Sequence, residues 1–493
     1  MNHLTDLGLI AETIGRQPTT VVVLPSISLG YLTRRFRPDL DNFEETFLFH
    51  LFWLAKSNIE LIFIFTEGFD KHLIDHSLYT VAQHLNTKQS SLRSRIQILT
   101  VPSSQEGLSA SLYQSPQHLE QLATLLNHRQ AVISAWQVGH YEISVAQELD
   151  CRLLSGNAAC AKYDNKSAGR KLAQAAGVAT AVGVEDIYSL TCAQKQMSLL
   201  AKQAAAGREF ILKLNKEDGG SGIGYLKLDQ SLNNIEQLTI SKNIPKAQFE
   251  QQLAVQGAVL EQMIVADVIA VPSIKLFISD SGEAQVLATH DQLEDAEVYL
   301  GVHFPANAAY RNELIQQGLK LAKQCCKVGI RGLFSIDFLA KHNPTTGTWQ
   351  LYFLELNLRA SATTHPYFWT KYLTGAQYNN DSGHLEKNGE QFFYNAYEHF
   401  QHPLLNTIDT QKIIRACHEQ GLSYCRQKQT GVHLHMLSMI NAFNRFGATI
   451  IGTSQQQIEE LSTELNTLIQ KLCEQTEGHF STDEKKPAKK LVL

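Results

Sequence analysis

The sequence predicts a multidomain protein in which an α/β unit precedes α+β units. The chain has 493 residues, more than one hydrophobic core usually serves, so two or three packed units are expected. Strand-like and helix-like segments alternate over the first 155 residues, which is typical of a parallel α/β layer. Farther along, short strand-like runs follow one another with few helices between them, as in an antiparallel sheet with flanking helices.

The N-terminal α/β unit is expected over residues 1–155. Its first strand is the β-branched run 21–24, which Pro25 closes with a turn. The other elements follow from the spacing of apolar residues. They are strands at 59–65 and 96–101 and helices at 43–56 and 73–85.

The middle unit is expected over residues 156–372, with a first lobe at 156–260 and a second at 261–372. Helical composition over 166–176 stops at Gly177, a residue suited to helix C-termini, and a longer helix is expected over 309–328. Short apolar runs give the strands of this unit. They lie at 209–215, 258–264, 273–279, 284–288, 333–339 and 349–356.

The remaining chain is expected to form a smaller C-terminal domain at 373–474. Polar composition predicts a surface loop at 379–391, and apolar spacing predicts amphipathic helices at 404–417 and 454–472. The lysine-rich end, 475–493, is expected to be a disordered tail.

Composition favours a cytoplasmic protein. The formal net charge of −5 argues against a general nucleic-acid binder, which usually carries a basic face. No apolar stretch reaches the roughly 18–20 residues of a membrane helix, and residues 1–6 lack the features of a secretory signal. The eight cysteines form no CxxC pair, so reduced structural thiols are expected.

Two segments late in the middle unit carry the residues with the clearest chemistry. Alternate side chains of a strand share a face, so Glu355, Asn357 and Arg359 are expected to point the same way. If the strands pair as a hairpin, Asp337 joins them, and burying this cluster without a ligand would be costly. Carboxylate and carboxamide oxygens suit Mg²⁺, with Mn²⁺ as the alternative. The competing interpretation is a solvent-facing strand with ordinary charges.

A second candidate feature is a lysine followed by a glycine-rich stretch. Lys213 stands alone in an apolar strand and could offer its charge to phosphates. Glycine lets a loop fold closely over phosphates and aim backbone N–H groups at them. The stretch comprises Gly219, Gly220, Ser221, Gly222 and Gly224. It lacks a Walker lysine and the strand-to-helix context of dinucleotide sites, and an ordinary hairpin turn is the alternative.

The order of these motifs resembles the ATP-grasp superfamily. The resemblance implies two lobes that close on ATP, and a carboxylate activated as an acyl phosphate that an amine then attacks. It further implies that Asp337, Glu355 and Asn357 bind the metal and that Arg359 faces the substrate. The positions implied to bind the nucleotide are Lys166, Lys213 and the hinge residues Glu261, Met263 and Ile264.

A closer likeness to the pheganomycin-type peptide ligases covers almost the whole chain. The segments that carry it include 166–170, 289–292, 363–366 and 431–436. The likeness implies a pre-ATP-grasp N-terminal domain, a two-lobed ATP-grasp domain and a short C-terminal domain, with a peptide as one possible substrate. Ser335 stands where many superfamily members carry a basic residue that contacts phosphate. Lys275 or Arg331 could provide that contact here.

Two further residues are candidates for catalysis. His290 could bind or deprotonate the attacking amine, or it could form a local hydrogen bond at a strand end. Lys275 alternates with apolar neighbours and could point into the cleft or lie on the surface. His365 could fix a turn or act directly, while His433 and His435 are expected to be structural rather than metal ligands.

The expected activity is therefore that of an ATP-dependent carboxylate–amine ligase that uses ATP and Mg²⁺. Its expected partners are small-molecule or peptide acids and amines, with no nucleic acid and no membrane, and a homo-oligomer is possible. Two alternatives share the nucleotide residues. One is a non-catalytic ATP-binding scaffold or sensor, and the other is an ATP-dependent small-molecule kinase.

Overall fold

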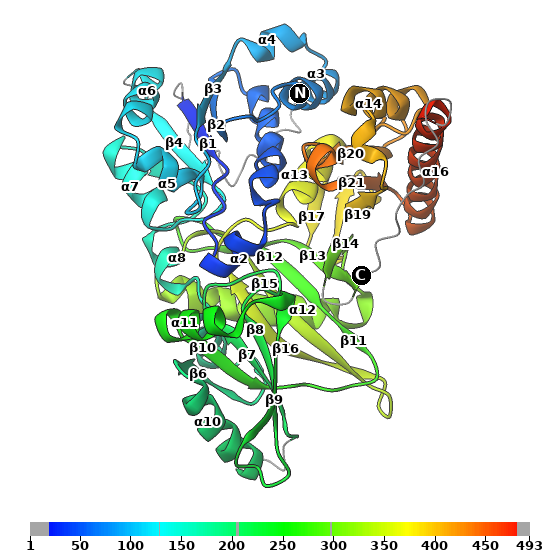
Figure 1. The fold of residues 1–493 in the computed structure, drawn as a ribbon. Coiled ribbons are helices and arrows are strands. Elements are labelled where there is room, and N and C mark those ends of the chain that lie inside the picture. Colours follow the sequence, from blue (N-terminus) through cyan, green and yellow to red (C-terminus); the bar gives the residue numbers. More distant parts are fainter. Residues whose placement is uncertain (1–18, 128, 204–206, 296–297, 481–493) are drawn as a thin grey trace.

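The computed structural model describes residues 19–480 except 128, 204–206 and 296–297. Its strands form three sheets, and the N-terminal sheet and the second sheet lie at opposite ends of the molecule (Figure 1). The predicted order, an α/β layer followed by antiparallel sheets, is confirmed. Within the described residues, no helix is both long and apolar enough to cross a bilayer.

The N-terminal sheet is parallel and has the strand order β3-β2-β1-β4-β5. It confirms the three predicted strands and adds two. The strands are β1 (Thr19–Leu24), β2 (Ile59–Thr66), β3 (Ile96–Val101), β4 (Ala131–Ala135) and β5 (Arg152–Leu153). Its helices are α2 (Tyr31–Phe36), α3 (His72–Leu85), α4 (Gln89–Arg93), α5 (Leu108–Tyr113), α6 (Pro116–Leu126) and α7 (His140–Glu148).

The predicted helix at 43–56 is instead a 3₁₀ segment, η1 (Leu40–Ala55). Most of its side chains are buried, including Phe47, Phe52 and Trp53. The segment packs on both its own sheet and a later helix, α13 (Thr364–Thr374). It is therefore enclosed on several sides, unlike the amphipathic helix that the apolar spacing predicted.

The second sheet is antiparallel, with the strand order β6-β10-β7-β8-β9. Its strands are β6 (Gly183–Ile187), β7 (Glu209–Leu214), β8 (Ile223–Leu228), β9 (Ile235–Ile240) and β10 (Ala258–Gln262). The helices before and around it are α8 (Ala158–Tyr163), α9 (Lys166–Ala175), α10 (Leu190–Gln203) and α11 (Lys246–Gln256), with a short 3₁₀ turn, η2 (Ser241–Asn243).

The third sheet has 11 strands, in the order β11-β15-β12-β13-β14-β19-β18-β17, with β16 beside β15 and β21 joining β19 to β20. Helix α12 (Ala308–Lys327) packs against it. The first group of strands is β11 (Ile269–Ala270), β12 (Pro272–Ile278), β13 (Ala284–Asp295), β14 (Val298–Phe304), β15 (Gly332–Asn343) and β16 (Thr348–Asn357). The second group is β17 (Gln377–Asn379), β18 (His384–Lys387), β19 (Glu390–Gln401), β20 (Gly431–His435) and β21 (Arg445–Gly452).

Residues 373–474, which were expected to form a separate unit, contribute strands β17–β21 to this third sheet. Strand β14 pairs with β19, so a division at residue 372 crosses one hydrogen-bonded sheet. The domain limits themselves stay a prediction.

Three local predictions in this region are wrong. The expected loop at 379–391 contains β18 and the start of β19, because this polar hairpin lies at a sheet edge where side chains need not be apolar. The expected helix at 404–417 is divided into η3 (Leu405–Thr407) and α14 (Thr410–Glu419), since the Asp409 side chain caps a new helix at Gln411 N–H.

The third error concerns the expected tail at 475–493. The last helix, α16 (Gln455–Phe480), continues through residues 475–480, and 481–493 lie outside the described residues. A short helix, α15 (Met439–Phe443), precedes β21.

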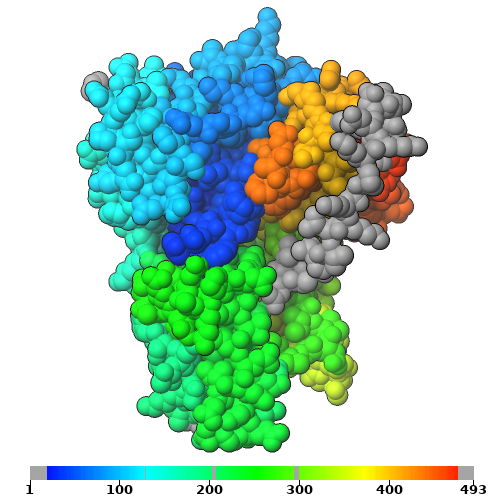
Figure 2. Space-filling model, in the orientation of Figure 1, coloured from blue at the N-terminus to red at the C-terminus, as the bar shows by residue number. Residues whose placement is uncertain are grey.

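The loop between β7 and β8 docks on the N-terminal unit. The Glu217 carboxylate accepts the backbone N–H groups of Leu32 at 3.2 Å and Thr33 at 2.8 Å, in the first turn of α2. A carboxylate there satisfies N–H groups that lack partners within the helix. Figure 2 shows the resulting contact, where the blue N-terminal segment lies directly on the green second-sheet region. The two units therefore meet through a specific polar contact.

Gly30 permits this approach, and Gly30→Ala is expected to disturb it. A methyl group at Gly30 would lie 2.5 Å from Glu217 Cδ and also against the Lys216 carbonyl oxygen, so the loop would have to move. We expect the free energy of unfolding to fall by roughly 1–3 kcal/mol, as for other overpacked sites. Denaturant unfolding measures this change.

Gly207→Ala is the matched control, because the nearest atom to its added methyl would be 3.7 Å away. Equal losses of stability in both variants would contradict the proposed close contact at Gly30.

Candidate active site

The predicted hairpin forms the centre of the site. Strands β15 and β16 pair antiparallel, with Asp337 opposite Glu355 and Ser335 opposite Asn357. The four side chains therefore share one face of the sheet, as the alternation predicted. The neighbouring strand β12 adds Lys275 to this face, opposite Ser335.

The oxygen atoms of this face form a donor set that fits Mg²⁺. Asn357 Nδ2 donates to Asp337 Oδ2 at 2.9 Å. Asn357 Oδ1 is buried and accepts no hydrogen bond from any residue that the structure describes. With Glu355 directly across the hairpin, two carboxylates and a carboxamide oxygen lie together, and such hard oxygens are the ligands that Mg²⁺ prefers. Their roles as metal ligands stay a prediction.

The two carboxylates have opposite pKa shifts. Burial raises the pKa of Asp337 to about 6. Burial also acts to raise the pKa of Glu355, but the adjacent Lys166 and Arg359 outweigh it, so this pKa lies below its ordinary value. Lys166 Nζ lies 2.9 Å from Glu355 Oε1. The site therefore keeps a stable negative charge at Glu355 because two cations face it.

Arg359 connects three parts of the chain. Its Nη1 donates to Asp164 Oδ1 at 2.8 Å, and its Nη2 pairs with Asp218 Oδ1. Burial opposes the charged form of Arg359, but these carboxylates more than compensate and raise its pKa. Asp164 precedes helix α9 and Asp218 belongs to the β7–β8 loop. Sequence reasoning missed both, because single aspartates in loops follow no recognisable spacing.

The two lysines predicted to bind phosphates each lie beside an acidic residue. Lys166 is the first residue of α9, whose N-terminus is capped by the Asn165 side chain. Lys213 Nζ lies 2.8 Å from Glu261 Oε2, across paired strands. The other oxygen of Glu261 accepts from Arg170 Nη1 at 2.5 Å. Arg170, a partner that sequence reasoning missed, therefore completes a buried charge network.

The glycine-rich stretch is a loop only in its first part. Gly219, Gly220 and Gly222 have φ values of 56°, 78° and 72°, a conformation that glycine adopts readily. Ser221 lies buried between them. Gly224 is the exception, because strand β8 begins at Ile223 and the glycine there packs against an aromatic ring. Gly224 is thus part of the sheet rather than of the loop.

The predicted hinge connects the second and third sheets. Strand β10 ends at Gln262, and residues 263–268 lead to β11. Met263 N–H donates to the Glu209 carbonyl at 3.0 Å, while Ile264 lies within the connection. The contacts with adenine expected of Glu261, Met263 and Ile264 stay a prediction.

Lys275 lies in the interior, so the surface alternative is wrong. It is fully buried, and its Nζ donates to Ser361 Oγ at 3.0 Å and Thr364 Oγ1 at 2.9 Å. Arg331, in contrast, donates to the carbonyls of its neighbours Cys326 and Ile330. Lys275 is thus the cation beside Ser335.

His290 has a local partner. Its Nε2 lies 2.6 Å from Tyr394 Oη, and burial lowers its pKa well below the ordinary value. This geometry favours the local hydrogen bond over proton transfer, and the role of His290 toward an amine stays a prediction.

Three further histidines, His365, His433 and His435, lie buried next to one another. His433 stacks on Trp369 with ring centroids 3.7 Å apart, and His365 meets His435 at 4.4 Å. Burial lowers the pKa of His435 to about 3. Across the described part of the chain, no three His, Cys, Asp or Glu side chains gather as a metal site. The structural role expected of His433 and His435 agrees with this packing.

Comparison with known families supports the same fold. Residues 158–244 and 230–381 match the family described as IQCH-like, ATP-grasp. Residues 412–465 match the family described as PGM1 C-terminal domain.

Two relatives are similar over long stretches. L-propargylglycine–L-glutamate ligase of Streptantibioticus cattleyicolor is 25% identical over 429 residues, which cover 84% of this chain and 87% of that protein. IQ motif-containing protein H of Danio rerio is 21% identical over 398 residues, which cover 69% of this chain but only 37% of that protein.

Solved structures share the fold at low identity. The biotin carboxylase of Campylobacter jejuni aligns with a TM-score of 0.54 and 12% identity, over 93% of this chain and 95% of that one. The ADP complex of N5-carboxyaminoimidazole ribonucleotide synthetase aligns with a TM-score of 0.53 and 14% identity, over 94% of this chain and 99% of that one. Together with the match over residues 158–381, these likenesses show that the chain has an ATP-grasp fold.

Proposed function

We propose that this protein is an ATP-dependent ligase that joins a carboxylate to an amine. The observation that carries the proposal is the shared face of Asp337, Glu355 and Asn357, flanked by Lys166 and Arg359. The long similarity to a protein named as an amino-acid ligase supports the same chemistry.

The residues of this arrangement would bind both the metal and the nucleotide. Asp337, Glu355 and Asn357 would hold Mg²⁺, or Mn²⁺ in its place. The ion would neutralise charge on the phosphates of ATP. Lys166 and Lys213 now face Glu355 and Glu261, and both ammonium groups can turn toward phosphates when the nucleotide binds. Gly219, Gly220 and Gly222 would present backbone N–H groups to the same phosphates.

The substrate groups would lie beyond the phosphates, near Arg359. The carboxylate oxygen attacks the terminal phosphorus of ATP, which gives an acyl phosphate and ADP. The amine nitrogen then attacks the acyl carbon, inorganic phosphate leaves, and the amine gives up one proton. Arg359, a planar and permanently charged group, would hold the carboxylate and its acyl phosphate. The docked β7–β8 loop would keep water from that intermediate.

The cellular compartment and the substrates expected for this protein follow from the chemistry of the reaction. ATP and Mg²⁺ are abundant in the cytoplasm, where the eight cysteines would also stay reduced. The acid and the amine would be amino acids, other small molecules or short peptides.

Replacing Glu355 tests the assignment directly. Glu355→Gln keeps the size of the side chain but removes the charge that faces Lys166, and we expect ADP release to fall on the order of 10²–10³-fold. The measurement is a screen of amino-acid and short-peptide pairs for ADP release, with mass spectrometry of the product. Glu419→Gln, on the exposed end of α14, is the matched control.

The products of that screen separate the possible activities. An amide product confirms a ligase, and a phosphorylated product without amide indicates a kinase. Magnesium-dependent protection by ATP against heat, with no ADP release for any pair, indicates a nucleotide-binding scaffold. Full turnover by Glu355→Gln would refute the metal site.

The buried Lys275 gives a prediction about pH. Burial lowers its pKa to about 7, whereas an unfolded lysine titrates near 10.4. Between these values the unfolded chain binds more protons than the folded one, so this lysine makes the free energy of unfolding rise with pH. We expect Lys275→Met to lose this rise, which amounts to at most about 1.4 kcal/mol per pH unit.

Denaturant unfolding at pH 7, 8, 9 and 10 checks this prediction by comparing each variant with the unchanged protein. Lys412→Met, on an exposed position of α14, controls for the loss of a lysine elsewhere. A constant difference between Lys275→Met and the unchanged protein across this range would contradict it.

A further inference from the structure

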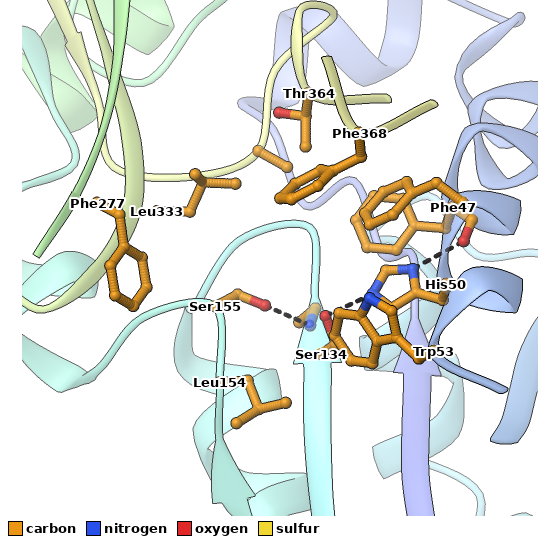
Figure 3. A pocket seen from close by; sticks show the side chains of 13 residues that line it. Phe47, His50, Trp53, Ser134, Leu154, Ser155, Phe277, Leu333, Thr364 and Phe368 are labelled. Carbon is orange, nitrogen blue, oxygen red and sulfur yellow. Dashed lines mark hydrogen bonds between the residues drawn. The ribbon is translucent and has the colours of Figure 1, made fainter. Parts of the chain in front are cut away.

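An apolar cavity lies at the end of the sheet face that carries the candidate active site. Figure 3 shows Phe277 and Leu333 on one side of it and Phe47, His50 and Trp53 on the opposite side. The first pair belongs to the third sheet, and the other three belong to η1 in the N-terminal unit. The cavity therefore exists only where the two units meet.

Two of the residues that line the cavity lie on the same sheet face as the polar residues of the site. Along β15, Leu333 shares a face with Ser335 and Asp337, and Phe277 lies opposite Leu333 on β12, two residues past Lys275. At about 3.3 Å per residue, Leu333 lies roughly 13 Å from Asp337.

Two residues that line the cavity are connected to Lys275 and Arg359. Thr364 lines the cavity, and its Oγ1 also accepts a hydrogen bond from Lys275 Nζ at 2.9 Å. Ala360 lines it too and directly follows Arg359 in the chain. The Ala360 N–H donates to the Trp136 carbonyl at 2.7 Å, which fixes this loop against the N-terminal sheet.

The walls of the cavity exclude charge. Phe49 and Phe368 stack with centroids 4.7 Å apart, and none of the 13 lining residues is Asp, Glu, Lys or Arg. His50 is neutral, because burial lowers its pKa to about 3 and both ring nitrogens have partners, the Phe47 carbonyl and Ser134 Oγ. A charged side chain would lose its hydration here without gaining an opposite charge.

We propose that this cavity receives the side chain of an apolar α-amino acid that is one of the two substrates. Its α-carboxylate would lie at the end of the cavity formed by Ala360, next to Arg359 in the chain. The inference rests on the proposed ligase function and adds the substrate class. It predicts that aliphatic amino acids bind well and that glutamate does not.

Binding measurements test the cavity without relying on turnover. Calorimetric titration with L-leucine, L-alanine and L-glutamate in the presence of Mg²⁺ and ADP compares the probes. We expect leucine to bind at least tenfold more tightly than glutamate. Leu333→Phe, which fills the cavity, should weaken leucine binding at least tenfold and alanine binding less than threefold, since pocket size discriminates apolar groups on this scale.

Two further variants keep the test decisive. Phe277→Leu enlarges the same cavity and should improve binding of L-phenylalanine relative to leucine. Leu119→Phe makes the same change as Leu333→Phe at a partly buried position of α6, away from the cavity, and should alter neither ratio. The proposal would be overturned if leucine bound no more tightly than glutamate. It would also be overturned if the leucine-to-alanine and phenylalanine-to-leucine affinity ratios were unchanged in both cavity variants.

The test also separates this inference from the ligase function. Selective binding of leucine without ADP release for any pair would retain the cavity and refute the ligase. If Leu333→Phe and Phe277→Leu form amides with the same preference for amino-acid side chains as the unchanged protein, the ligase function stands and the proposed role of the cavity is refuted.

Discussion

The site depends on the paired contacts of Arg359. One guanidinium holds Asp164 before α9 and Asp218 in the β7–β8 loop, while its own backbone continues from β16. The same loop carries Glu217, which binds the first turn of α2. Three units of the chain are therefore tied together within a few residues of the candidate metal ligands. Loss of this cation would leave two partly buried carboxylates without a partner, which is more costly than never having had the pair.

The same balance of charge explains why the acidic face is tolerable. Asp337 and Glu355 lie directly opposite each other, an arrangement that is unfavourable when both are ionised. Lys166 and Arg359 offset the charge at Glu355, and burial favours the protonated form of Asp337. A divalent cation at this face would offset the same charge and leave Lys166 available for phosphates. Burying this polar cluster is thus unfavourable for the stability of the fold, and the cluster is suited to binding a ligand.

The sheet face also orders the site in space. Successive positions on β15 run from Asp337 through Ser335 to Leu333, and β12 runs beside it from Ser273 through Lys275 to Phe277. Oxygen ligands, a buried amine and an apolar wall follow one another along these two strands. The N-terminal unit closes the apolar end with η1 and the loop after β4. The N-terminal unit therefore has a direct part in forming the cavity.

Local patterns in the sequence predicted nine of the strands, four of the helices and the shared face of Asp337, Glu355 and Asn357, because side-chain alternation needs no distant information. They also placed Lys213 in a strand just before the glycine-rich stretch. Only the tertiary structure decided that Asp164, Asp218 and Arg170 complete the charge network, that Lys275 is buried, and that β17–β21 extend the third sheet. These features join residues that lie far apart in the chain, and single charged residues or short polar strands leave no periodic signal that predicts such partners.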